Sequence, residues 1–111
     1  MVVLDANALQ DCRIIGAFKK GFILVESSDK VLLFVDQHAA DERINLERVC
    51  REQDKHVLQA SEQDQLVACM SAVKLTDQTT TDKQLKIVNE LLKCEFPFAC
   101  AHGRPTIIAL E

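Results

Sequence analysis

One junction constrains the fold more than any other part of the chain. The unbroken apolar run Val31-Leu32-Leu33-Phe34-Val35 passes directly into a charged stretch that begins at Asp36. A short apolar run of this kind predicts a buried strand, whereas the isolated apolar residues after it have helical spacing. The sequence therefore predicts a strand that leads straight into a helix over about 39–54.

The junction also gathers residues that carry chemistry. Asp36 falls at the strand end, and His38 and Glu42 are four apart, so on a helix they project from one face. Glu47 lies five residues beyond Glu42, about 140° further round, and should point elsewhere. An imidazole with carboxylates at this place could make half of a metal site. The alternative is a surface histidine among ordinary charges; Arg43, Glu47, Arg51 and Lys55 are expected to form a mixed-charge solvent face.

Two further apolar segments predict a small sheet. Segments 12–18 and 22–25 are expected to be strands, with a turn at 19–21 and a hairpin loop at 26–30 before the strand at 31–35. Neither 22–25 nor 31–35 alternates apolar and polar residues, which indicates that both sheet faces are covered. We expect an α+β fold: a small, mostly antiparallel sheet with helices packed on one face and the other face used for dimerisation.

The second half of the chain predicts two more helices. Ser61 with Asp64 is a capping pattern before the apolar segment 66–73, and Thr81 with Gln84 is a capping box that opens a helix to Leu92. The structure of segment 55–60 is ambiguous from its sequence. We interpret residues 1–111 as one domain, made of 12–54, a short joint at 55–65, and 66–111.

Composition limits the classes of function. Apolar residues make up 48% and charged residues 27%, as in ordinary globular proteins, and the sequence gives no support for membrane binding. Five cysteines without a regular spacing favour reduced thiols, some on a metal, over a disulfide framework. The net charge of −4 argues against a free-standing nucleic-acid binder. Metal ions or another part of a larger protein would have to attract DNA.

A second informative segment is Cys100-Ala101-His102-Gly103-Arg104-Pro105. In an extended strand Cys100 and His102 would point the same way, as a clamp for a borderline-soft cation such as zinc. Arg104 is suited to bind phosphate or to anchor a carboxylate. The alternative is a tight loop with a core cysteine and a surface histidine. Cys69, inside an apolar segment, is by itself most simply a small buried residue.

Together these segments resemble the C-terminal endonuclease domain of the MutL family. Asp36 to Glu47 matches the family pattern D-Q-H-A-x2-E-x4-E at every fixed position, 100–105 resembles C-P-H-G-R-P, and Ala68-Cys69-Met70 resembles A-C-R. The resemblance covers about residues 12–110. The chain has Ala101 where the family motif has proline, and Met70 where it has arginine. In these two departures it is similar to the third eukaryotic MutL homologue, the MutL-gamma subunit.

The resemblance implies a metal-dependent endonuclease that nicks double-stranded DNA in mismatch repair and in meiotic crossing over. The implied zinc ligands are His38, Glu42, Cys69, Cys100 and His102. Asp36 and Glu42 are the implied catalytic residues, Arg104 would orient the site or contact phosphate, and Glu47 is a weaker motif member. We expect Asp36 and Glu42 to hold a catalytic Mn²⁺ or Mg²⁺ and the remaining four ligands to hold Zn²⁺.

The resemblance further implies a nuclear protein whose partner is the C-terminal domain of the first MutL homologue, with self-association when that partner is absent. Family members carry a regulatory lobe between the first helix and A-C-R; here residues 55–66 fill that interval. The family's N-terminal ATPase region also has no counterpart in these residues. The competing function is a zinc-stabilised dimerisation module that is inactive in this form. A zinc deaminase would need H-x-E and P-C-x-x-C, and the sequence contains neither.

Overall fold

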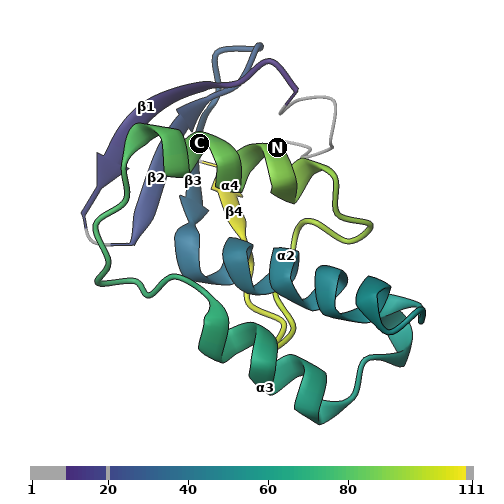
Figure 1. Cartoon of the computed structure of the whole chain (residues 1–111). Helices are drawn as coiled ribbons and strands as arrows, with labels where there is room; N and C mark the ends of the chain where they lie inside the picture. Colours follow the sequence, from purple (N-terminus) through teal and green to yellow (C-terminus); the bar gives the residue numbers. More distant parts are fainter. Residues whose placement is uncertain (1–9, 20, 110–111) are drawn as a thin grey trace.

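The computed structural model describes residues 10–19 and 21–109, which form a four-stranded antiparallel sheet and a set of helices (Figure 1). The strands lie in the order β1-β2-β3-β4, so sequence neighbours are also spatial neighbours. The elements are β1 (Arg13–Phe18), β2 (Phe22–Glu26), β3 (Leu32–Asp36), α2 (Gln37–Glu52), the 3₁₀ helix η1 (Val57–Gln59), α3 (Glu62–Ser71), α4 (Thr81–Leu92) and β4 (Ile107–Ala109). None of the described helices combines the length and apolar character needed to cross a membrane.

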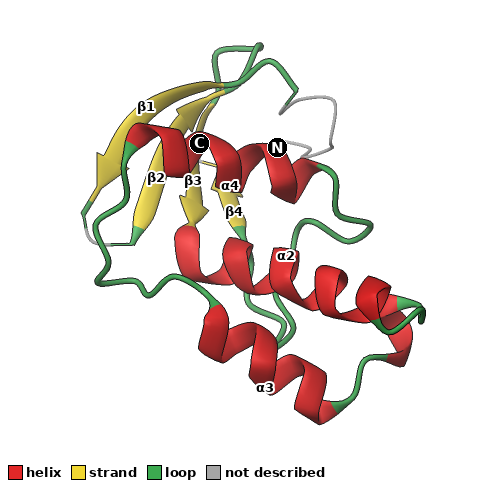
Figure 2. Cartoon of the chain, in the orientation of Figure 1, coloured by secondary structure: helices red, strands yellow, loops and turns green. Residues whose placement is uncertain are grey.

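One face of the sheet carries the main core. Burial alternates along β2 and β3, so every second side chain points into the protein. Helix α4 lies across this face and α2 continues from the end of β3 (Figure 2). The core consists of Ile23, Val25, Leu33, Val35, Ala40, Ile44, Ile87, Val88, Leu91 and Ile107. The predicted α+β fold, with helices packed on one face of an antiparallel sheet, is confirmed.

The opposite face of the sheet is apolar but partly open. The Phe34 ring lies with its centroid 4.9 Å from that of Phe18 and 6.3 Å from that of Phe22. Ile15 and Ile108 are 44% and 45% exposed. Apolar and polar residues do not alternate along β2 and β3, because this outer face is as apolar as the inner one. Only the inner face is buried within the chain.

Local capping signals set most helix boundaries. Asp36 caps α2 by accepting a hydrogen bond from the Ala39 backbone N–H at 3.0 Å, so the helix begins two residues before the predicted position 39. The Ser61–Asp64 capping box is confirmed, but it opens α3 at Glu62, earlier than the predicted 66. The predicted box at Thr81 is wrong by one residue, because the Thr80 hydroxyl accepts from the Lys83 N–H and caps α4.

Polar contacts of Asp64 hold the short connection between α2 and α3 in place. The Asp64 carboxylate accepts hydrogen bonds from the Ser61 N–H and the Gln53 amide, and it pairs with the Lys55 ammonium at 2.5 Å. Lys55, the Ser61 N–H and Gln53, in that order of effect, hold the pKa of this carboxyl well below its usual value. Asp64 therefore fixes the end of α2 to the first turn of α3, beside a second apolar cluster of Leu46, Cys50 and Ala68.

We expect Asp64→Asn to lower the melting temperature at pH 7. The amide carries no charge to pair with Lys55, and its NH₂ group would face the donors that now bond the carboxylate. A carboxyl whose pKa is lowered by folding adds stability above its unfolded pKa of 3.8, and this stability is lost as pH falls through the lower folded pKa. The difference in melting temperature between wild type and variant should thus be constant from pH 7 to 5 and shrink below 3.8. A difference that stays constant into strong acid would contradict this account.

Candidate metal centre

The site forms where the first turns of α2, the end of α3 and the loop before β4 meet. Figure 1 shows α3 running alongside α2, with the segment that leads to β4 passing close to both. Glu42 lies at the centre of this meeting and is only 1% exposed, although it is a carboxylate. A buried carboxylate requires partners, because an unpaired charge in the interior is strongly unfavourable.

One partner group lies on the side of α3. The Glu42 Oε2 atom is 3.5 Å from His38 Nε2, and the Cys69 Sγ atom is 3.6 Å from the same nitrogen. His38 Nδ1 lies 2.8 Å from the Val73 carbonyl oxygen. Because a carbonyl can only accept, Nδ1 donates to it, and Nε2 is the ring nitrogen that is directed toward Glu42 and Cys69. This hydrogen bond fixes the tautomer and orientation of the ring, as is usual for metal-ligating histidines.

The other partner group lies on the loop before β4. The Glu42 Oε1 atom is 2.7 Å from His102 Nδ1, and Cys100 joins them in a second cluster of donor atoms. The Cys100 N–H donates to the Arg104 carbonyl, and Gly103, at φ +82°, allows the reversal. The Arg104 N–H donates to Cys100 Sγ at 3.4 Å. Cys100 and His102 are thus brought together by a tight turn, not by the extended segment expected from their spacing.

The donor set fits a transition-metal ion. Within each triad, His38–Glu42–Cys69 or Glu42–Cys100–His102, one donor atom from each residue lies within 4.8 Å of the others. Tetrahedral zinc with bonds of about 2.0–2.3 Å separates its ligand atoms by roughly 3.3–3.8 Å. The 3.5 and 3.6 Å separations around His38 match that range. Imidazole nitrogen, thiolate sulfur and carboxylate oxygen are also the ligand types that zinc prefers.

The five predicted metal ligands therefore lie together, but they divide differently from our expectation. We expected Glu42 to share one ion with Asp36 and the other four residues to hold a second. In the structure Glu42 belongs to both triads, and neither triad of described residues includes Asp36. Asp36 is half-buried at the start of α2 and caps that helix. Arg104 is exposed, and it forms hydrogen bonds with Cys100 through its backbone N–H and carbonyl.

Glu47 points away from both triads, as its helical position predicted, and has a structural contact. Its carboxylate accepts hydrogen bonds from the Glu95 and Phe96 N–H groups at 2.6 and 3.1 Å and lies 3.6 Å from the Arg43 guanidinium. Arg43 Nε also donates to the Ala99 carbonyl. The prediction that Arg43 and Glu47 belong to a solvent face is wrong: both are buried, and they hold the segment that leads into Cys100.

Three further polar residues of α2 hold the opposite segment, and sequence reasoning missed them. The Gln37 amide donates to the Lys74 and Asp77 carbonyls. Asp41 accepts from the Val73 N–H at 2.8 Å, and Asn45 donates to the Ala68 carbonyl. These contacts position the chain on either side of Cys69. The only sequence signal for them is the density of polar residues directly after a buried strand.

The cysteines outside the triads are poor candidates for reaction. All five cysteines are free thiols. Burial, with a smaller effect from the Glu47 charge, raises the pKa of Cys94 to about 12, and burial also raises the pKa of Cys50. These two thiols therefore stay protonated at neutral pH and act as small apolar side chains.

Fold and site define a small α+β domain in which a buried helix gathers side chains that could hold a metal ion, and in which one face of the sheet is apolar and partly open. The family model for the MutL C-terminal dimerisation domain matches residues 15–91, and the chain belongs to this family. It is 37% identical over 92 residues to the DNA mismatch repair protein MutL of Aquifex pyrophilus, and 34% identical over 92 residues to that of Aquifex aeolicus (strain VF5). Each alignment covers 83% of this chain and 18% of the relative, so the chain spans about a fifth of those proteins.

We expect Glu47→Ala to lower the free energy of unfolding by about 1–3 kcal/mol, because it removes the acceptor of two backbone N–H groups and leaves Arg43 unpaired. Hydrogen exchange at the Glu95 and Phe96 amides should accelerate. The control is Glu52→Ala on the same helix; Glu52 is exposed and 3.9 Å from Arg48, so that change should stay within about 0.5 kcal/mol. Equal effects of the two substitutions would contradict a positioning role for Glu47.

Proposed function

We propose that this chain is the metal-dependent endonuclease domain of a MutL-type protein and that it nicks double-stranded DNA in mismatch repair. The observation that carries the proposal is the buried Glu42 carboxylate, whose two oxygens face imidazoles of two different triads. Membership of the MutL family supports it, as does similarity to the Aquifex relatives, which are DNA mismatch repair proteins.

The chemistry required is hydrolysis of a phosphodiester: a water oxygen bonds to phosphorus and the bond to the leaving oxygen breaks. Bound divalent ions would supply activation of that water and neutralisation of the phosphate charge. Glu42 would bridge the two triads, while His38 with Cys69 and Cys100 with His102 would complete them. The His102 side chain is 55% exposed, so the second triad is the one open to a substrate.

Asp36 is proposed as the second catalytic carboxylate. It lies at the junction between β3 and α2, six residues before Glu42, and its backbone is held by a hydrogen bond from its own N–H to the Thr106 carbonyl. Asn caps a helix as well as Asp does, so Asp36→Asn should preserve α2 while removing the charge.

The finer assignment to the third eukaryotic MutL homologue rests on Ala101 and Met70 in place of the family's proline and arginine. This assignment would also imply a role in meiotic crossing over, a nuclear location and pairing with the first MutL homologue. The short joint also fits loss of the regulatory lobe. The alignment with MutL of Carboxydothermus hydrogenoformans, 25% identical, runs over 173 residues although this chain has 111, so that relative has additional residues within the matched region.

We expect Glu42→Gln to lose most of the zinc that wild type retains after dialysis, because both triads share this ligand, and to lose nicking of supercoiled plasmid with Mn²⁺. Asp36→Asn is the matched variant: it should keep zinc content and melting temperature but lose nicking. Both assays should include a MutL-type partner chain. Wild-type nicking by Asp36→Asn would remove that residue from the reaction, and unchanged zinc in Glu42→Gln would reject the shared ligand.

The same experiment distinguishes the competing function. A wild-type chain that retains zinc, assembles with its partner and leaves the plasmid intact would be a zinc-stabilised dimerisation module. A chain that binds neither Zn²⁺ nor Mn²⁺ would contradict both functions.

The outer sheet face is the proposed dimerisation surface. Phe18, Phe22 and Phe34 pack against one another there, and Ile15 and Ile108 flank them while nearly half exposed. A contiguous apolar face of this kind is typical of an association surface. Its occupant would be the sheet of a second MutL-type domain, either a copy of this chain or a homologue.

We expect Phe34→Glu to shift the chain to monomers in sedimentation velocity at micromolar concentration, because it places a charge at the centre of the apolar face. The control is Leu58→Glu, which changes a 78% exposed residue away from the sheet and should leave the association state unchanged. A wild-type chain that stays monomeric alone and with a MutL homologue, or a Phe34→Glu chain that associates like wild type, would reject this surface.

A further inference from the structure

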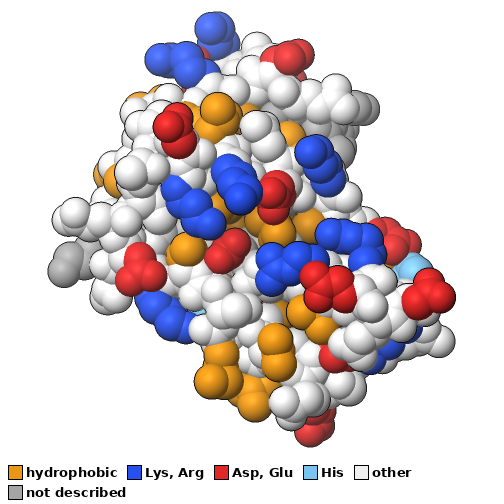
Figure 3. All heavy atoms as spheres, viewed as in Figure 1, with side chains coloured by type: hydrophobic (Ala, Val, Ile, Leu, Met, Phe, Trp, Pro, Cys, Tyr) orange, Lys and Arg blue, Asp and Glu red, His pale blue; other side chains and the backbone are white. Residues whose placement is uncertain are grey.

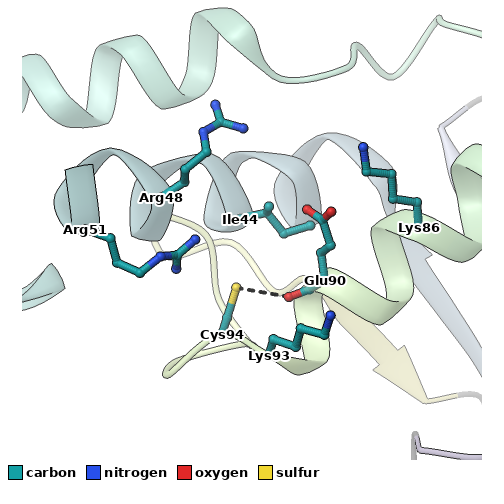
Figure 4. A pocket seen from close by; sticks show the side chains of 7 residues that line it. All are labelled: Ile44, Arg48, Arg51, Lys86, Glu90, Lys93 and Cys94. Atoms are coloured by element: carbon teal, nitrogen blue, oxygen red, sulfur yellow. Dashed lines mark hydrogen bonds between the residues drawn. The ribbon is translucent and has the colours of Figure 1, made fainter.

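We propose that a basic groove between α2 and α4 binds the phosphodiester backbone of the DNA on which the metal centre acts; this inference rests on the proposed function and assigns its substrate-binding surface. The groove has a volume of about 380 Å³ and is lined by Ile44, Arg48, Arg51, Lys86, Glu90, Lys93 and Cys94 (Figure 4). Arg48 and Arg51 come from α2, Lys86 comes from α4, and Lys93 is the residue that caps the end of α4. The groove is therefore formed by the packing of these two helices.

The groove extends to the end of α3. An adjoining hollow of about 180 Å³ shares Ile44, Arg48, Lys86 and Glu90 with it and adds Lys83 and Ser71. Ser71 is the last residue of α3, two residues after Cys69 of the first triad. A strand lying in this groove would therefore run from Lys93 to the end of the helix that carries Cys69.

The local charge is opposite to that of the whole chain. The two hollows together contain five cations, Arg48, Arg51, Lys83, Lys86 and Lys93, and two acids, Asp41 and Glu90. The chain as a whole has 13 basic and 17 acidic residues. Figure 3 shows blue basic side chains gathered over this flank of the molecule, with acidic groups between them.

Within residues 10–19 and 21–109, Arg48 is the groove cation that forms an ion pair, and this pair is weak. Arg48 lies 3.9 Å from Glu52, but both side chains are about half exposed or more, and such a pair is weak. Asp41, in contrast, already accepts a hydrogen bond from the Val73 N–H. The positive charge of the groove is thus exposed, whereas part of its negative charge is engaged within the fold.

The arrangement favours a linear polyanion over a single small anion. The cationic side chains are distributed along the groove in Figure 4 and do not converge on one point. Neighbours one helical turn apart, such as Arg48 and Arg51, are separated by about 5–6 Å at Cβ. A backbone with one charge per nucleotide can meet such a row, and it explains how an acidic domain could hold DNA.

The test is fluorescence anisotropy of a labelled 30-base-pair duplex at 50–200 mM salt, in the Asp36→Asn background so that the DNA stays intact. We expect Arg48→Gln/Lys86→Gln to weaken binding about tenfold or more at the lowest salt. The plot of log affinity against log salt should become less steep by about 2. Glu90→Gln should strengthen binding, because it removes the acid from the groove.

Arg13→Gln/Lys30→Gln is the matched control, since it also removes two positive charges, from side chains that are 69% and 81% exposed and lie outside the groove, and it should leave affinity near wild type. Melting temperatures establish that each variant folds. Equal loss with Arg13→Gln/Lys30→Gln, no measurable duplex binding by wild type, or equal affinity for polyglutamate would overturn the assignment to DNA.

The two proposals fail in distinguishable ways. If the groove variants weaken binding but the wild-type chain with its partner never nicks DNA, the groove stands and the nuclease function does not. If wild type nicks and the groove variants bind and nick equally well, the nuclease function stands and the groove does not.

Discussion

The structure depends on one requirement, that the polar side chains of a buried helix find partners outside it. Residues 39–47 of α2 are all buried, and more than half of them are polar or charged. A helix buried on all sides is usually apolar. Here Asp41 and Asn45 bond the segment around α3, whereas Arg43 and Glu47 bond the segment before Cys100. The helix is stable in this position only because it organises both segments.

The same contacts assemble the metal centre. Glu42 projects between the two segments that its neighbours hold, so Cys69 approaches from one side and His102 from the other. Positioning contacts and site residues therefore alternate along a few turns of one helix. Such a design holds the candidate ligand atoms on rigid elements and leaves His102 as the most exposed of them. It also explains why residues without any chemical role are concentrated in the motif.

The sequence predicts what local rules determine. The strand at 31–35, the shared face of His38 and Glu42 and the Ser61 cap all follow from spacing or short-range hydrogen bonding, and the structure contains them. Tertiary partners do not follow from spacing. Arg43 and Glu47 have the pattern of a solvent face, yet they are buried because the segment at 95–99 folds over them. The division of the ligands into two triads likewise depends on a turn at Gly103 that no periodicity reveals.

A carboxylate common to two triads makes them thermodynamically linked. An ion bound on the side of His38 would withdraw charge from Glu42 and would thereby weaken what the same carboxylate offers to an ion on the side of His102. Linkage requires the reverse effect to be equal, so each ion changes the affinity for the other by the same factor. Occupancy of the buried position would then set the affinity of the exposed one, and the domain would respond to the supply of two ions as a single cooperative unit.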